Sequence, residues 1–181
     1  MRPFFLIGFM GSGKSTMGRL LSAYSGLQLI DMDKFIEARF HATVKEIFAQ
    51  RGEQGFRLIE RAVLHEIGEF SDVVIATGGG TPLQPGNMEY MNSAGTTIFL
   101  DSSIDSIYMR LSQPKALAKR PLLAGLSPDE LRRFITDTRQ ARLPFYEKAQ
   151  LRFDSSRLDS PEQREQSCRQ LALLLGLEHV S

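Results

Sequence analysis

Short apolar runs alternate along this chain with longer segments in which apolar residues recur at helical spacing. The first four runs are almost wholly apolar, as is typical of strands covered by helices on both faces. Strands that alternate with helices predict a parallel sheet between two helical layers. The expected strands are Phe4–Ile7, Leu27–Ile30, Val73–Ala76, Thr97–Leu100 and Leu151–Phe153.

Helical patterns fill the intervals between these runs. Two of the predicted helices carry start signals: Ser127-Pro128 is followed by Asp129 and Glu130, and Ser160-Pro161 opens the last helix. The chain contains no internal repeat, low-complexity tract or linker, so a single domain spanning 1–181 is expected. The other helical patterns cover 14–22, 43–51, 56–70 and 104–111.

The composition narrows the choice of partners. With a formal net charge of +1, the chain has no overall attraction to nucleic acid or to an anionic membrane surface. Cys168 is the single cysteine, which excludes an intrachain disulfide and favours a packed thiol. The apolar run at the N-terminus is too short for a signal peptide, and no stretch could span a bilayer. A monomer in the cytoplasm is therefore expected.

The strongest chemical signal is a phosphate-binding loop at residues 8–15, which read Gly-Phe-Met-Gly-Ser-Gly-Lys-Ser. They match G-x-x-x-x-G-K-[ST] at every fixed position, between a predicted strand and a predicted helix. Glycines let backbone N–H groups converge on a phosphate, and the helix N-terminus favours its negative charge. In such loops the lysine reaches the β- and γ-phosphates and the serine hydroxyl binds Mg²⁺, roles that fall here to Lys14 and Ser15.

A phosphate loop alone does not distinguish a kinase from a motor or a switch. Two carboxylates, Asp31 and Asp33, follow the second predicted strand, where ligands of open α/β sheets bind. One carboxylate could hold a water on Mg²⁺, and the other could accept a hydrogen bond from an attacking hydroxyl. The alternative is that Asp33 only caps the next helix.

Further polar motifs follow. Gly78-Gly79-Gly80 at the end of the third strand favours a ligand that lies against bare backbone, although a flexible turn is the alternative. Arg57 and Glu60 are three residues apart on a helical pattern, where a surface ion pair would explain them equally well. Lys119–Gly125 has the composition of a loop, and a mobile lid over about 111–127 is expected to bring Arg120 to the phosphates.

In combination and in this order, the motifs resemble shikimate kinases over roughly residues 4–157. The resemblance implies a three-layer P-loop kinase fold whose five parallel strands lie in the order 2-3-1-4-5. It also implies transfer of the ATP γ-phosphoryl group to the 3-hydroxyl of shikimate, a step toward chorismate and the aromatic amino acids. The motifs are the phosphate loop, Asp31-x-Asp33, Phe56-Arg57-x-x-Glu60, Gly78-Gly79-Gly80, Arg120-Pro121-Leu122-Leu123 and Arg142-x-Pro144-x-Tyr146.

Roles for single residues follow from the same resemblance. Asp33, Lys14 and Arg120 would be catalytic, with Asp33 as the base and the two cations on the transferring group. Ser15 would bind one Mg²⁺ ion directly, and Asp31 would bind it through water. Shikimate would be held by Asp33, Arg57, Gly79, Gly80 and Arg142, with Phe48 and Phe56 either as the pocket wall or as plain core. ATP would be bound by Gly11, Ser12, Gly13, Lys14, Ser15, Thr16, Arg110, Arg120 and Arg157.

Two features depart from the family pattern. Gly55 stands before Phe56, where a longer side chain is usual, and should loosen the helix start; the segment that carries Arg157 fits only loosely. Two other functions are considered: a different hydroxyl kinase of the gluconate type, and a nucleotide-binding module without acceptor chemistry. A gluconate-type kinase would not need two arginines set to grip a carboxylate beside a triple glycine, and a complete Asp33, Arg57 and Arg142 set argues against a module without acceptor chemistry.

Overall fold

The computed structural model describes residues 1–118, 120–123 and 125–180, and for Pro121 it describes the backbone alone. Lys119 and Ala124, which belong to the predicted lid, and the terminal Ser181 of the predicted domain lie outside the described residues.

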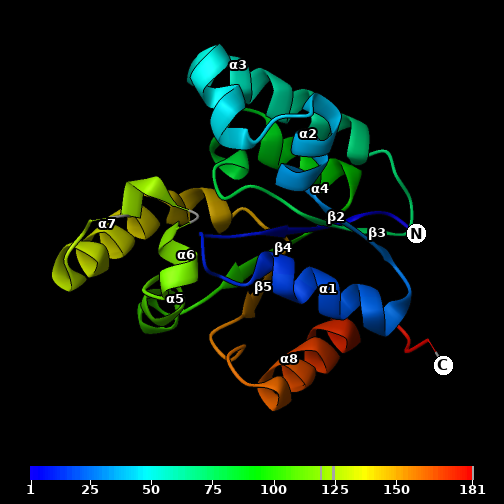
Figure 1. The fold of residues 1–181 in the computed structure, drawn as a ribbon. Coiled ribbons are helices and arrows are strands. Elements are labelled where there is room, and N and C mark those ends of the chain that lie inside the picture. The colour runs from blue at the N-terminus through cyan, green and yellow to red at the C-terminus, as the bar shows by residue number, and fades with distance from the viewer. Residues whose placement is uncertain (119, 124, 181) are drawn as a thin grey trace.

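A five-stranded parallel sheet forms the centre of the molecule (Figure 1). The strand order is β2-β3-β1-β4-β5, which confirms the predicted order. All four neighbouring pairs are parallel, so the carboxyl ends of the strands point to one edge of the sheet. The strands are β1 (Phe4–Ile7), β2 (Gln28–Asp31), β3 (Val73–Ala76), β4 (Thr96–Asp101) and β5 (Leu151–Asp154).

Helices cover both faces of the sheet, as predicted. Figure 1 shows α1 (Lys14–Ser25) and α8 (Pro161–Leu174) together on one face. The other face carries α2 (Met32–Phe40), α3 (Val44–Ile67) and α4 (Asn87–Ala94). The remaining helices, α5 (Ile104–Leu111), α6 (Pro114–Ala118) and α7 (Pro128–Tyr146), gather beyond the carboxyl ends of the strands, with short 3-10 turns at Thr81–Leu83 and Pro121–Leu123. Within the described residues, no helix is both long enough and apolar enough to cross a membrane.

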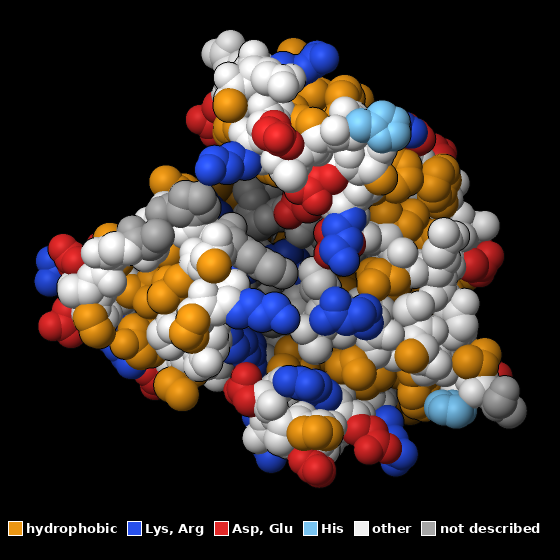
Figure 2. Space-filling model, in the orientation of Figure 1, with side chains coloured by type: hydrophobic (Ala, Val, Ile, Leu, Met, Phe, Trp, Pro, Cys, Tyr) orange, Lys and Arg blue, Asp and Glu red, His pale blue; other side chains and the backbone are white. Residues whose placement is uncertain are grey.

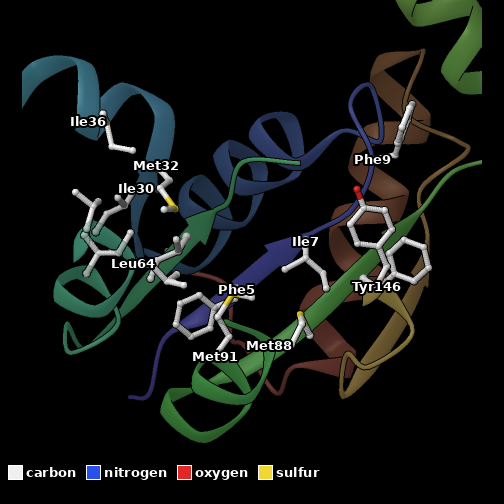
Figure 3. Packing of buried hydrophobic residues seen from close by; sticks show 14 of the residues in the cluster. Phe5, Ile7, Phe9, Ile30, Met32, Ile36, Leu64, Met88, Met91 and Tyr146 are labelled. Carbon is white, nitrogen blue, oxygen red and sulfur yellow. The ribbon is translucent and has the colours of Figure 1, made fainter. Parts of the chain in front are cut away.

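The central strand explains why the apolar runs do not alternate with polar residues. Phe4 and Leu6 of β1 belong to the core cluster under α1 and α8, whereas Phe5 and Ile7 belong to the opposite cluster. Figure 3 shows Phe5 beside Met91 of α4 on that second face. Because both faces are covered, every side chain of the strand is buried.

Cys168 lies in the α1–α8 cluster, which confirms the packed thiol. Burial raises the pKa of this thiol above its usual range, so the reactive thiolate is disfavoured.

Helix starts follow the signals in the sequence. Ser127 and Ser160 cap α7 and α8, and in each case the third helical residue returns a hydrogen bond to the cap. Two short helices, α4 and α6, were not predicted, and α2 was expected only within the alternative that Asp33 caps a helix. The α6 helix lies in the predicted lid but before Lys119–Gly125, and the described part of Lys119–Gly125 contains only the short 3-10 turn at Pro121–Leu123, as a loop can. Mobility of the lid stays a prediction.

The break in α3 lies at Gly52 instead of Gly55. Gly52 has φ 66° and ψ −179°, which interrupts the helix between the two predicted helical segments. Gly55 continues the second segment, and a Cβ there would lie 2.7 Å from Cβ of Arg51. The absence of a side chain at Gly55 therefore relieves crowding next to the kink.

We predict that Gly95→Ala destabilises the fold strongly. A Cβ at Gly95 would lie 2.1 Å from the carbonyl oxygen of Pro3, where α4 leads into β4. Backbone must shift to relieve this contact, and we expect a loss of about 3 kcal/mol in the free energy of unfolding. Gly176 is the matched control, because it has φ 65° and open space around it. Gly176→Ala should lose only about 1–2 kcal/mol from the left-handed backbone. Urea unfolding tests this, and a smaller loss at Gly95 than at Gly176 would contradict it.

Candidate active site

The phosphate loop links the end of β1 to the start of α1 and closes around the ammonium group of Lys14. Lys14 Nζ donates to the carbonyl oxygens of Gly8 at 2.8 Å and Phe9 at 3.0 Å. Gly11 and Gly13 have φ 77° and 98°, a region that glycine adopts without strain. This shape places the amide groups of the loop at a helix N-terminus, where a phosphate is favoured.

A cleft of about 470 Å³ opens over this loop at the carboxyl ends of the strands. Figure 2 shows lysine and arginine side chains gathered around a hollow in the middle of the face, with acidic side chains on one side. Most predicted nucleotide residues line the cleft, but Ser12 does not, because its side chain is buried behind the loop. The predicted residues that do line it are Gly11, Gly13, Lys14, Ser15, Thr16, Asp31, Asp33, Gly79, Arg110 and Arg120.

Several charges converge on Lys14. Burial within the loop lowers the pKa of Lys14 to about 8, and the neighbouring Arg120 and Arg142 act in the same direction. Asp33 and Asp31 oppose that shift. Lys14, Arg120 and Arg142 therefore lie near Asp31 and Asp33, an arrangement that suits a highly charged ligand.

Asp31 occupies the junction between β2 and α2. Its carboxylate accepts a hydrogen bond from Ser15 Oγ at 2.7 Å and caps α2 through the amide of Lys34 at 3.4 Å. The alternative that Asp33 caps this helix was wrong, because Asp31 is the cap and Asp33 lies in the first turn. Asp33 is therefore free of the capping role.

Asp33 faces the cleft, where solvent reaches it from the open side and protein surrounds it on the others. Partial desolvation raises its pKa to about 6, and the nearby negative charges of Asp31 and Glu60 add to the increase. Lys14 opposes them. A carboxylate with such a pKa is ionised at neutral pH and can accept a proton more readily than an ordinary aspartate.

The segment Gly78–Gly80 lies against every other part of the site. A Cβ at Gly78 would stand 2.9 Å from Oε1 of Glu60 and 3.4 Å from Oδ1 of Asp33. At Gly79 it would approach the phosphate-loop backbone at 3.6 Å and a guanidinium nitrogen of Arg142 at 3.7 Å. At Gly80 it would lie 3.1 Å from the guanidinium of Arg57. These glycines provide room for close approach, so the flexible-turn alternative is not needed.

Arg57 is held by a buried carboxylate. Its Nη1 donates to Oε2 of Glu60 at 2.8 Å, while Oε1 of Glu60 accepts from the hydroxyl of Thr81 at 2.7 Å. Glu60 is only 2% exposed, so the alternative of a surface ion pair was wrong. A buried carboxylate with both oxygens bonded fixes the guanidinium beside Gly80.

Two phenylalanine rings pack beside the guanidinium of Arg57. Phe48 and Phe56 pack with ring centroids 4.4 Å apart, and the Arg57 guanidinium carbon lies 5.8 and 5.5 Å from the two centroids. Phe56 is buried in the core, whereas Phe48 is partly exposed at its margin. Phe56 therefore belongs to the core as well as to the wall behind Arg57.

Arg142 projects from α7 toward the phosphate loop. Its guanidinium carbon lies 5.7 Å from the ring centroid of Phe9 and its Nη1 faces Gly79. One turn earlier on the helix, Arg139 pairs with Asp101 at the end of β4. Arg57 and Arg142 thus flank the glycine segment, and both lie beside the nucleotide cleft instead of lining it.

Arg110 is tied to the protein on several sides. Its guanidinium donates to the carbonyl oxygens of Gly11, Ser155 and Ser156 and to the carboxylate of Asp159, at 2.8–3.1 Å. These bonds fasten the phosphate loop to the segment after β5. The edges of the guanidinium are occupied, so any contact with a base must use its face.

Arg120 and Arg157, the other two cations predicted to bind ATP, differ in position: the first lines the cleft and the second does not. Arg120 Nη1 donates to the carbonyl of Ala116 at 3.0 Å, and the side chain lines the cleft. Arg157 is exposed, and it is absent from the described residues that line the cleft. The segment instead contributes Leu158 and Asp159, together with Arg164 from α8. These three were missed because only the tertiary fold brings the segment after β5 and the start of α8 to the loop.

Fold and site together define a P-loop nucleotide-binding protein in which two arginines, Arg57 and Arg142, lie beside the nucleotide cleft. The family described as shikimate kinase matches residues 10–172. A shikimate kinase of Parabacteroides distasonis is 48% identical over 158 residues, which cover 87% of this chain and 90% of the relative.

Two solved structures of shikimate kinases also align with nearly the whole of this chain. The shikimate kinase of Bacteroides thetaiotaomicron aligns with a TM-score of 0.90 and 44% identity over 97% of this chain and 99% of its own. The shikimate kinase of Acinetobacter baumannii in complex with shikimate aligns with a TM-score of 0.81 and 32% identity over 97% and 94%. This chain belongs to the shikimate kinase family.

We predict that Asp33→Asn stabilises the folded protein above neutral pH. The pKa of the Asp33 carboxyl group is about 6 in the folded protein, above its usual 3.8. Ionisation of this group therefore lowers the free energy of unfolding, by an amount that grows from about pH 4 to pH 6 and is constant at higher pH. Solvent screens these charges, so we expect a gain of at most about 1 kcal/mol, or about 2–4 °C in Tm at pH 8. The gain should be smaller at pH 4. Thermal unfolding of Asp33→Asn and of an exposed control, Asp137→Asn, tests this. An equal or lower Tm for Asp33→Asn at pH 8 would contradict it.

Proposed function

We propose that this protein transfers the γ-phosphoryl group of ATP to the 3-hydroxyl of shikimate, giving shikimate 3-phosphate and ADP. The reaction would serve the synthesis of chorismate and the aromatic amino acids. Membership of the shikimate kinase family supports this function. The second support is the single segment Gly78–Gly80, which touches the phosphate loop, Asp33 and both arginines of the acceptor pocket.

The acceptor pocket suits a hydroxylated carboxylic acid. Arg57 and Arg142 present guanidinium groups on two sides of the glycine segment, and guanidinium matches a carboxylate in charge and shape. Backbone groups of Gly79 and Gly80 would contact the ring substituents. With the carboxylate at the arginines, a hydroxyl across the ring would be directed to Asp33, which lies beside Gly78 and lines the nucleotide cleft.

Asp33 would orient the reacting hydroxyl and take its proton. As the hydroxyl oxygen forms its bond to the γ-phosphorus, the bond from that phosphorus to the β,γ-bridging oxygen breaks and ADP leaves with that electron pair. The proton of the hydroxyl passes to Asp33 and later to solvent. Lys14 and Arg120 would neutralise charge on the transferring group from the other side of the cleft.

One Mg²⁺ ion is expected with ATP, and the residues present fit it. Ser15 and Asp31 offer two hard oxygen ligands 2.7 Å apart at the end of the phosphate loop. Ser15 would bind the ion directly and Asp31 through water, because Mg²⁺ keeps several waters and takes few protein ligands. The chemistry that such an ion supplies is neutralisation of the phosphate oxygens.

The nucleotide would lie along the phosphate loop. Gly11, Ser12, Gly13 and Thr16 would contact its phosphates through the backbone or a hydroxyl. Arg110 would meet the base with the face of its guanidinium, and Arg157 would need to move inward to reach it. Closure of the lid at about 111–127 would bring Arg120 onto the phosphates. We place the protein in the cytoplasm as a monomer, with ATP, ADP and shikimate as its partners and without nucleic acid or membrane.

The test of this function is ADP release from Mg²⁺-ATP with shikimate, with gluconate and with neither. We expect release that depends on shikimate and saturates with it. Release that gluconate stimulates instead would indicate a different hydroxyl kinase. The same slow rate in all three reactions would indicate a nucleotide-binding module without acceptor chemistry.

We predict that Asp33→Asn lowers kcat on the order of 100-fold or more, the usual scale of general base catalysis. ATP binding should change little, because Lys14 and the loop remain. In the wild type, kcat/KM for shikimate should fall below about pH 6 as Asp33 becomes protonated. Steady-state kinetics from pH 5 to 8 measures both. Normal turnover per folded molecule of Asp33→Asn would leave the base unassigned.

We predict that Arg142→Ala raises the KM for shikimate by losing about 1.5–3 kcal/mol of carboxylate binding, and that Arg142→Lys recovers only part of it. Arg57→Ala should raise the same KM and also lower Tm, because buried Glu60 loses its partner. The control is Arg169→Ala, which removes an exposed ion pair with Glu165. The KM for shikimate and the Tm, measured for Arg142→Ala, Arg57→Ala and Arg169→Ala, distinguish these three variants. An unchanged shikimate KM in both Arg57→Ala and Arg142→Ala would exclude the carboxylate clamp.

A further inference from the structure

We propose that the hydroxyl of Tyr146 is a positioning group for substrate binding: it fixes the Gly79–Gly80 peptide and thereby aims the Gly80 amide at the acceptor. The proposal rests on the proposed function for the identity of that acceptor. Tyr146 is the last residue of α7, and no part of the mechanism above uses it.

Tyr146 is fully buried, with 0% of its surface exposed. Its hydroxyl donates a hydrogen bond of 2.7 Å to the carbonyl oxygen of Gly79, and its ring packs on Phe99 with centroids 5.3 Å apart. Figure 3 shows the hydroxyl pointing toward the same end of the sheet as Phe9. Burial raises the pKa of Tyr146 above its usual range, so the phenol stays protonated and remains a donor. Ring and hydroxyl thus have separate partners.

The hydrogen bond from Tyr146 affects the site through the geometry of one peptide unit. The C=O of Gly79 and the N–H of Gly80 belong to one planar trans unit and point in opposite directions. A hydroxyl that holds the carbonyl on the Tyr146 side therefore turns the Gly80 amide to the other side. Among the described residues, the amides of Gly78, Gly79 and Gly80 have no backbone or side-chain acceptor. Buried or half-buried amides without a partner are available to a ligand.

A glycine segment needs such a restraint more than other segments do. Three glycines in succession retain broad freedom in φ and ψ, so an amide aimed at a ligand would otherwise be ordered only on binding. Thr81 donates to Glu60 and fixes the far end of the segment. The Tyr146 hydroxyl restrains its middle, between that end and the phosphate loop.

The same helix carries Arg142, one turn before Tyr146. The helix is held before Arg142 by the pairing of Arg139 with Asp101 and after it by the bond from Tyr146 to Gly79. Arg142 projects between these two attachments toward Gly79. The Tyr146 hydroxyl therefore sets the spacing between an arginine of the clamp and the amide of Gly80.

The test is Tyr146→Phe, which keeps the ring on Phe99 and removes only the hydroxyl. We expect the KM for shikimate to rise about three- to tenfold, the effect of one hydrogen bond, while the KM for ATP stays within about twofold. The fall in kcat should be smaller than the rise in the shikimate KM. The matched control is Tyr90→Phe, which removes a hydroxyl bonded to the carbonyl oxygen of His65 at 2.8 Å, outside the site.

Tyr90→Phe should leave both KM values unchanged even if it lowers Tm as much as Tyr146→Phe does. An unchanged shikimate KM in Tyr146→Phe would overturn the proposal. A rise shared equally by both substrates would overturn it too, because a purely structural role predicts that pattern. If the wild type does not turn over shikimate at all, the proposed function fails before this comparison begins, so the two failures are distinguishable.

Discussion

Close approach to bare backbone at Gly78–Gly80 is the constraint on which the site depends. Gly79 lies beside the phosphate loop, Gly78 beside Asp33 and Gly80 beside the guanidinium of Arg57. Any side chain at Gly78 would press on the buried carboxylate of Glu60. The two substrates of a phosphoryl transfer must lie within bonding distance, and bare backbone beside both of their sites lets them approach each other closely.

The parallel sheet makes that arrangement available. Because β3 lies between β1 and β2, the segment after β3 emerges between the phosphate loop and Asp31. The charges gathered there are unfavourable for the fold alone: burial lowers the pKa of Lys14 to about 8, and desolvation raises that of Asp33 to about 6. Such pKa shifts are typical of a functional site, where charged groups are arranged to bind a ligand and not to stabilise the fold.

Local patterns in the sequence were enough to predict the strands and the longer helices, whereas the family resemblance implied the strand order. The strands Phe4–Ile7 and Val73–Ala76 match their predicted bounds, because covered parallel strands give continuous apolar runs. The start of α2 was misplaced because Asp31 ends a strand and caps a helix at once, which leaves no turn to recognise. The burial of Glu60 and the many bonds of Arg110 depend on segments far apart in sequence, so spacing alone could not reveal them.

The central claim is that the nucleotide cleft and the acceptor site together form one bond, between the γ-phosphorus of ATP and a hydroxyl oxygen of the acceptor. Identifying the product by ³¹P and ¹H NMR, after incubation with Mg²⁺-ATP and shikimate, tests this most directly. The account predicts one phosphate ester on the 3-hydroxyl for each ADP released. ADP and free phosphate without an ester, or an ester on another hydroxyl, would contradict the placement of Asp33 beside the nucleotide cleft and the acceptor site.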